Sequence, residues 1–106
     1  MSELDEMRDE IRKFVAERDW ERFHDPKNLA MAVASEAGEL CAELRWVPSE
    51  EADAFVRRPE VRARVADEIA DVAITLLMLA ERAGIDPIAA MRAKLEKNRA
   101  KYPAGS

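Results

Sequence analysis

The sequence predicts an all-α protein, a four-helix bundle, on the basis of three observations. Glycine and proline are scarce, with 3 and 5 among 106 residues, while alanine, glutamate, arginine and leucine are plentiful, which favours helices. Apolar residues recur at spacings of three and four in four segments. No segment alternates apolar and polar residues with a period of two, so we expect no sheet. The expected helices cover residues 4–18, 26–47, 59–83 and 87–101.

The first two helices follow from apolar spacing and from prolines. In residues 4–18 the amphipathic pattern is carried by Leu4, Met7, Ile11, Phe14 and Val15. Asp25 is a good N-cap for a second helix, because Pro26 then occupies the first helical position. This helix is expected to end before Pro48, and Ser49 is expected to cap a short helical turn in the connector.

The last two helices are also bounded by residues that start or end helices. The third helix should begin near Pro59 and stop at Gly84, because glycine is typical just after a helix. Asp86 and Pro87 should begin the fourth, which ends before Pro103. We therefore expect a single domain over residues 1–103 and a loose tail at 104–106. The third helix is apolar on most sides, which favours a homo-oligomer that covers it.

Composition excludes several classes of function. The net charge of -5 argues against a surface for a nucleic acid polymer. The first ten residues are polar and acidic, unlike a signal peptide, and the longest apolar stretch, residues 69–80, is too short to span a membrane. A cytoplasmic protein is therefore expected. The single cysteine, Cys41, has no disulfide partner in this sequence and suits a small core position.

Four acids form two matched pairs, Glu36 with Glu39 and Glu68 with Asp71. Each pair has i, i+3 spacing and so shares one helix face. Residues 29–47 match residues 61–79 in an internal repeat with an offset of 32, which places the first acid of each pair at the edge of an apolar stripe. Two such helices packed antiparallel could bring all four carboxylates together. Carboxylates beside a core need a proton or a partner.

A divalent cation is the favoured partner. All-oxygen ligation suits Mg²⁺, or Mn²⁺, whereas zinc is disfavoured without nearby cysteine or histidine ligands. A di-iron site requires Glu-x-x-His on two helices, and His24 is the only histidine. The structural alternative is a salt-bridge network with the arginines Arg45, Arg62 and Arg64. Glu43, one heptad after Glu36, is an additional ligand, a water-orienting base or part of a solvated face.

Mg²⁺ held by carboxylates commonly binds phosphates as well. Groups that could face phosphates share one face of the last helix: Lys94, Lys97, Asn98, Lys101 and Tyr102. Their cations could instead complement the helix dipole. Aromatic side chains in the connectors could stack on a base or fill gaps between helices; they are Trp20, Phe23, His24 and Trp46.

Taken together, these residues resemble the MazG-type all-α nucleoside triphosphate pyrophosphohydrolases, and within that superfamily the dCTP pyrophosphatase branch. The resemblance runs from about residue 19 to 103. It is carried by Glu-x-x-Glu, a spacer of 28 residues and Glu-x-x-Asp, by the string DWERFHDPKNLAMAVASEAGEL, and by DEIADV and KNRAKYP. It implies Mg²⁺-dependent hydrolysis of a nucleoside triphosphate, such as dCTP or a related or modified deoxynucleotide, to the monophosphate and pyrophosphate, in nucleotide-pool sanitation. It also implies a helical bundle whose sites form between the subunits of a homodimer or homotetramer.

The resemblance assigns roles by position. The residues that would bind Mg²⁺ are Glu36, Glu39, Glu68 and Asp71. The residues that would surround the nucleoside are Trp20, His24, Trp46 and Asn98. The candidates for the phosphates are Lys27, Lys94, Lys97, Lys101 and Tyr102. Ile11 replaces a histidine of the branch and Thr75 a tyrosine, both near the expected nucleotide pocket, so the base preference stays open.

A second interpretation comes from a different class of protein. The chain could be a non-catalytic helical oligomerisation or regulatory module that keeps the bundle without turnover. The intact acid quartet argues against this interpretation. Release of pyrophosphate from a panel of nucleotides would separate the two.

Overall fold

Helices make up nearly all of the chain in the computed structural model, which describes residues 1–105. The elements in order are α1 (Glu3–Glu17), the short 3₁₀ turn η1 (Glu21–Phe23), α2 (Pro26–Leu44), α3 (Ser49–Arg57), α4 (Pro59–Ala83) and α5 (Pro87–Lys101). No strand forms among residues 1–105, so the all-α prediction is confirmed. Residues 104 and 105 form a turn, and Ser106, the end of the predicted loose tail, lies outside the described residues.

The predicted caps explain where the long helices begin and end. The Asp25 carboxylate accepts a hydrogen bond from the backbone N–H of Asn28 at 2.8 Å, at the start of α2. Asp86 does the same for α5, where the backbone N–H of Ile88 donates to its Oδ1 at 2.9 Å. Gly84 ends α4 in the left-handed conformation with φ 68°, which a glycine adopts without strain. The bounds of α4 and α5 therefore match the prediction.

The connector between α2 and α4 differs from its prediction. α2 ends at Leu44, three residues early, because Pro48 forces the residue before it out of the helical conformation. The chain instead tightens into a turn in which the Val47 N–H donates to the Leu44 carbonyl at 3.0 Å. The expected short turn is a full helix, α3, and Ser49 is its first residue rather than its cap, a position that Pro48 takes without a side-chain bond.

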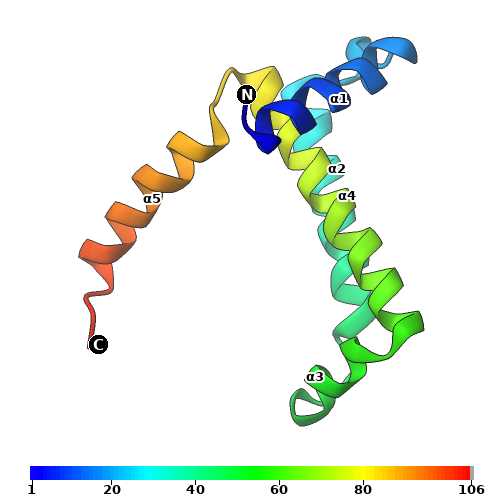
Figure 1. Cartoon of the computed structure of the whole chain (residues 1–106), viewed down its shortest axis with the longest axis vertical. Helices are drawn as coiled ribbons and strands as arrows, with labels where there is room; N and C mark the ends of the chain where they lie inside the picture. The colour runs from blue at the N-terminus through cyan, green and yellow to red at the C-terminus, as the bar shows by residue number, and fades with distance from the viewer. Residues whose placement is uncertain (106) are drawn as a thin grey trace.

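α2 and α4 form an antiparallel hairpin that dominates the packing of the chain (Figure 1). α3 joins them at one end, and α1 packs on α4 near the other end. The only buried apolar side chains among the described residues are Val15, Leu29 and Val61, one from each of α1, α2 and α4. The hairpin is therefore the scaffold, and its core is small. Nowhere in residues 1–105 is a helix both apolar and long enough to cross a bilayer.

Residues 1–105 of one chain do not form a closed four-helix bundle, so this part of the prediction is not confirmed. α5 leads away from the hairpin and ends far from it, so the chain has the shape of an arch (Figure 1). The radius of gyration is 16.7 Å, against about 13 Å for a compact domain of this length. Among residues 1–105 no helix packs closely on the apolar positions of α5, so spacing alone could not show where this helix packs.

Candidate functional site

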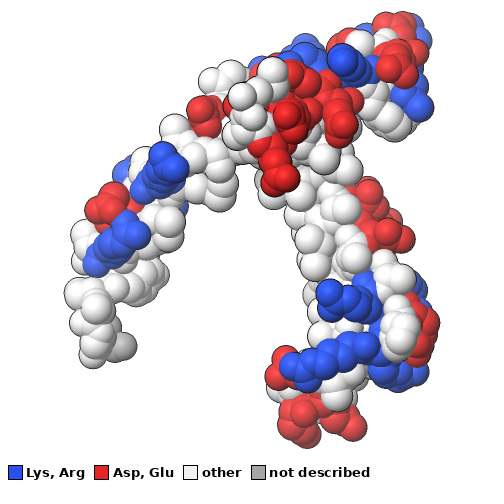
Figure 2. Space-filling view, in the orientation of Figure 1, with Lys and Arg blue, Asp and Glu red and all other residues white. Residues whose placement is uncertain are grey.

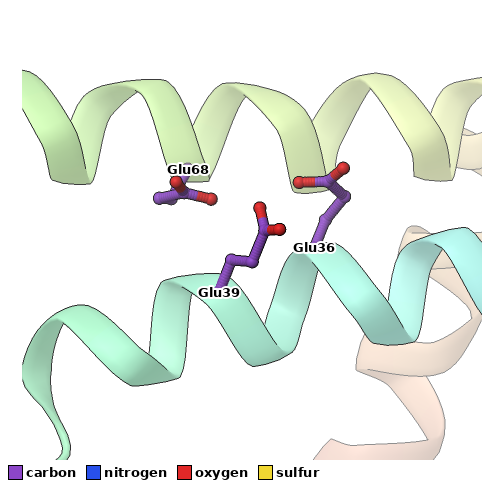
Figure 3. Close-up of side chains that lie close together, drawn as sticks. All are labelled: Glu36, Glu39 and Glu68. Carbon is purple, nitrogen blue, oxygen red and sulfur yellow. The ribbon is translucent and has the colours of Figure 1, made fainter.

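Three of the four acids meet between the two helices of the hairpin. α2 supplies Glu36 and Glu39, and α4 supplies Glu68, because antiparallel packing places the two halves of the repeat opposite each other (Figure 3). One carboxylate oxygen from each of these three residues lies within 4.8 Å of the others. Asp71 is not one of these three, but its charge is close enough to raise the pKa of Glu36 and of Glu68.

Two oxygens of this cluster are buried without a partner. They are Oε2 of Glu36 and Oε2 of Glu68, and neither receives a hydrogen bond. Burial raises the pKa of Glu36 above its ordinary value, and repulsion from Glu39 and Asp71 raises it further. The pKa of Glu68 is raised by the same causes in the same order. Unpartnered carboxylate oxygens that repel one another are the expected state of an oxygen-ligand site for a divalent cation.

Arginine does not neutralise the quartet. Of the three arginines considered above, only Arg64 joins α4 to an acid of α2, and that acid is Glu43, with the Arg64 Nε atom 3.0 Å from Oε2. No ion pair between described residues reaches Glu36, Glu39, Glu68 or Asp71. The salt-bridge alternative therefore has no support in the structure. Glu43 is engaged with Arg64 rather than grouped with the three carboxylates.

A small cavity of about 110 Å³ lies where α1 and η1 meet the end of α4. Its apolar floor comes from Ile11, Val15, Leu77 and Met78, and His24 forms part of its edge. On α4, Asp71, Thr75 and Met78 follow at i, i+4 and i+7 and so lie within about 60° of one another. The cavity therefore continues the helix face of the acid quartet, about 10 Å along α4 from Asp71.

Trp20 and His24 gather beside this cavity. The ring centroids of Trp20 and His24 are 6.4 Å apart, and those of Phe14 and Trp20 are 5.4 Å apart with an edge-to-face angle of 77°. Trp20 is 40% exposed. Thr75, which stands where the resemblance leads to a tyrosine, bonds back to its own helix: its hydroxyl donates to the Asp71 carbonyl at 2.9 Å.

Other predicted site residues are not brought together within one chain. Trp46 is 83% exposed and follows α2, whereas Trp20 and His24 precede it, so the length of α2, about 28 Å, separates them. Lys27 is exposed in the first turn of α2. The remaining predicted residues lie on or just after α5, away from the hairpin: Lys94, Lys97, Asn98, Lys101 and Tyr102. Figure 2 shows the basic atoms of α5 across open space from the hairpin.

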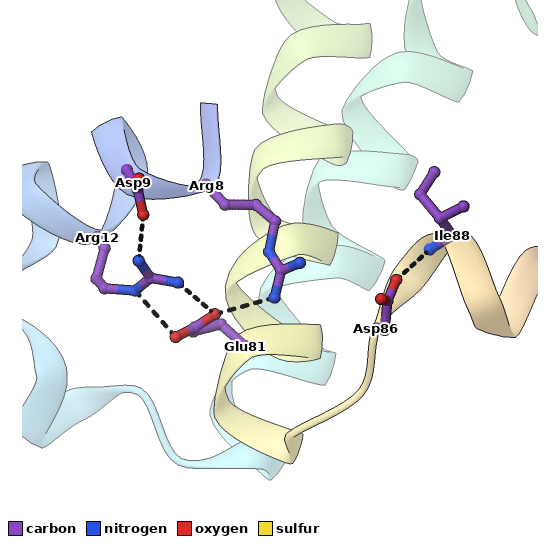
Figure 4. A network of polar contacts seen from close by, with 6 residues as sticks. All are labelled: Arg8, Asp9, Arg12, Glu81, Asp86 and Ile88. Atoms are coloured by element: carbon purple, nitrogen blue, oxygen red, sulfur yellow. Dashed lines mark hydrogen bonds and ion pairs between the residues drawn. The ribbon is translucent and has the colours of Figure 1, made fainter. Parts of the chain in front are cut away.

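One polar network near the cavity was not anticipated from the sequence. Arg8 and Arg12 of α1 both reach Glu81 of α4 (Figure 4). The i, i+4 spacing of the two arginines indicated a shared face. Their partner is 69 residues away from Arg12, and no local pattern marks such a pair.

Known proteins resemble this chain in both sequence and structure. Residues 34–106 match the MazG-like family. dCTP pyrophosphatase 1 from Bos taurus is 40% identical over 100 residues, and the protein of that name from Homo sapiens is 40% identical over 101. These matches cover 94% and 95% of this chain, which spans 59% of the length of each relative. A crystal structure of a pyrophosphatase from Archaeoglobus fulgidus superposes with a TM-score of 0.91 at 39% identity, over 97% of this chain and 94% of that one. The chain belongs to the MazG-like family.

Proposed function

We propose that this protein is a Mg²⁺-dependent nucleoside triphosphate pyrophosphohydrolase, for which Mn²⁺ can replace Mg²⁺. The substrate would be dCTP or a related or modified deoxynucleotide, and the role nucleotide-pool sanitation in the cytoplasm. The observation that carries the proposal is the cluster of three carboxylates within 4.8 Å, two of which have a buried oxygen without a partner. The pyrophosphatase names of the relatives at about 40% identity support the same reaction class.

The residues present fit the proposed cation. Glu36, Glu39 and Glu68 offer oxygen atoms alone, and Asp71 adds a fourth carboxylate at the edge, a set that suits a hard cation. When bound there, Mg²⁺ would offset the charge of the triphosphate and polarise its α-phosphorus. A carboxylate of the quartet would accept the proton of the attacking water. The water oxygen bonds to the α-phosphorus as the bond to the bridging oxygen breaks, and pyrophosphate leaves.

The nucleoside end of the substrate would occupy the cavity between α1 and α4. The cavity continues the quartet's face of α4 at a distance comparable with the length of a nucleoside. Its apolar lining suits a planar base, and His24, which is in contact with Trp20, supplies a polar group to that lining. Ile11 contributes apolar surface there, so it offers no hydrogen bond to a base.

The phosphate end would be bound by the lysines of α5, which lie away from the hairpin of their own chain, and we assign them to α5 of a second copy. α5 has 15 residues, a length at which an isolated helix is marginal in water. It nevertheless carries a row of exposed apolar side chains, Ile88, Met91 and Leu95, at i, i+3 and i+7. Packing this row on a neighbouring hairpin, as a homodimer or homotetramer, would stabilise α5 and bring its lysines toward a quartet. Exposed apolar residues on the hairpin, such as Met31, Ile69 and Leu76, provide a surface for it.

The experiment that tests the function is a panel of deoxynucleoside and nucleoside triphosphates with Mg²⁺, Mn²⁺ or chelator. Pyrophosphate and the monophosphate should be produced in equal amounts, and chelator should abolish turnover. Release of inorganic phosphate instead would place the cleavage at a different bond. No release from any nucleotide at high protein concentration would overturn the enzyme proposal and leave the non-catalytic module.

A further inference from the structure

All ion pairs between α1 and α4 in the described chain meet at one carboxylate, that of Glu81. Arg12 holds it with two parallel hydrogen bonds, from Nε to Oε1 and from Nη2 to Oε2, each 3.0 Å long (Figure 4). Arg8 adds a third contact at 3.4 Å from Nη2 to Oε2. Asp9 accepts a hydrogen bond from Arg12 on the α1 side. A bidentate pair of this kind specifies the orientation of both side chains as well as their proximity.

Apolar packing holds α1 only weakly. Val15 is its one buried side chain, and Met7 and Phe14 are 45% and 42% exposed. A helix of 15 residues has little stability of its own in water, so its position depends on what it packs against. The Glu81 network therefore adds to this limited apolar contact in setting the orientation of α1.

The same network forms part of the cavity wall. Arg8, Arg12 and Glu81 line the cavity together with Ile11. Ile11 follows Arg8 by three residues and so lies one turn further along the same side of α1. Any rotation or outward shift of α1 that releases Glu81 must also move Ile11 and change the width of the cavity.

We propose that Glu81 is a positioning residue for substrate binding: by holding Arg12 and Arg8 it keeps α1 in place as the wall of the nucleoside cavity. The inference rests on the proposed function, since it takes this cavity as the nucleoside site. Glu81 lies ten residues, about 15 Å, beyond Asp71 along α4, too far to touch the cation or the α-phosphorus. Its loss should therefore weaken nucleotide binding and leave the chemical step intact.

The test is the variant Glu81→Gln, which keeps the shape of the side chain and removes its charge. We expect KM for the nucleotide to rise about fivefold, which corresponds to a loss of about 1 kcal/mol of binding free energy. The value of kcat should stay within about twofold of the wild type. Hydrogen exchange of the α1 amides should accelerate, while that of α2 and α4 stays unchanged. Mn²⁺ affinity, measured by calorimetry without nucleotide, should be unchanged. Arg12→Lys should shift KM in the same direction, because lysine keeps the charge but loses the two parallel bonds.

The matched control is Glu60→Gln. Glu60 also pairs with an arginine, Arg58, at 3.0 Å, but at the opposite end of α4 from the cavity. It should retain the wild-type KM and the wild-type α1 exchange. An unchanged KM in both Glu81→Gln and Arg12→Lys, or an equal fall in kcat and kcat/KM, would refute the positioning role while the enzyme proposal stands. Absence of turnover in the wild type would overturn the enzyme proposal instead, and α1 exchange would still decide whether Glu81 holds α1.

Discussion

Replacing Met91 and Leu95 of α5 by aspartate should abolish the proposed oligomer and leave a monomer. Ile88, Met91 and Leu95 are 37%, 55% and 51% exposed in the single chain. At about 2 kcal/mol for a fully buried side chain, covering these exposed portions contributes about 3 kcal/mol per helix. Two α5 helices in a symmetric dimer then contribute about 6 kcal/mol, a factor of about 10⁴ in the dissociation constant.

Removing the two apolar residues from each helix eliminates about 4 kcal/mol of this stabilisation, or about three orders of magnitude in affinity. Burying the new carboxylates would weaken the dimer further. Light scattering over a range of concentrations should give at least twice 12.0 kDa for the wild type and 12.0 kDa for the variant. Turnover should be lost with the oligomer, because the lysines of α5 would no longer reach a quartet.

The control for this variant is Ala89→Asp with Ala93→Asp, which adds the same charges at the same i, i+4 spacing on the other side of α5. It should remain oligomeric. A monomeric wild type, or a Met91→Asp, Leu95→Asp variant with the wild-type mass and activity, would show that the apolar row of α5 does not form the interface.

Three further predictions concern the acid quartet and the lysines of α5. Glu36→Gln and Asp71→Asn should each lower kcat by at least about 10²-fold while circular dichroism stays unchanged, and normal turnover by either would place the metal site elsewhere. A quartet variant, Asp71→Asn, mixed with the α5 variant Lys94→Ala, Lys97→Ala should regain activity through mixed oligomers; mixtures as inactive as their components would exclude a site shared between subunits. The pKa values of Glu36 and Glu68 are raised on folding, mainly by burial and then by repulsion, so the folded state binds protons more tightly than the unfolded chain. Without divalent cations, the free energy of unfolding should therefore fall as pH rises through their folded pKa values, above the ordinary glutamate range. Mg²⁺ should reduce that fall, and a melting temperature equally sensitive to pH with and without Mg²⁺ would contradict the assignment.

The helices and the acid pairs could be predicted because their causes are local. A cap such as Asp25 acts on N–H groups three residues away, and Gly84 ends α4 through its own backbone conformation. The spacing of Glu36 and Glu39 places both on one face of whatever helix forms. The 32-residue offset to Glu68 then restricts the geometry further, because a short connector makes the two helices antiparallel.

The tertiary structure decided the features that depend on residues far apart in the sequence. Glu81 and Arg12 meet across 69 residues, and the same local pattern would suit many other partners for either side chain. The separation of Trp46 from Trp20 follows from the straightness of α2, whereas their aromatic character alone had suggested one site. The direction of α5 follows from the turn at Gly84 and Ile85, where the Ile85 N–H bonds to the Ala80 carbonyl at 2.9 Å.

The sequence by itself therefore determined the helical class, the ends of α4 and α5 and the i, i+3 spacing within each acid pair, because hydrogen bonding and side-chain periodicity operate over a few residues. Only the tertiary structure decided that three carboxylates converge and that two of them have a buried oxygen without a partner. It also decided that Arg64 pairs with Glu43 rather than with these carboxylates, and that α5 leads away from its own hairpin. The physical reason is that burial and charge repulsion are properties of surroundings assembled from distant segments, which a local pattern does not contain.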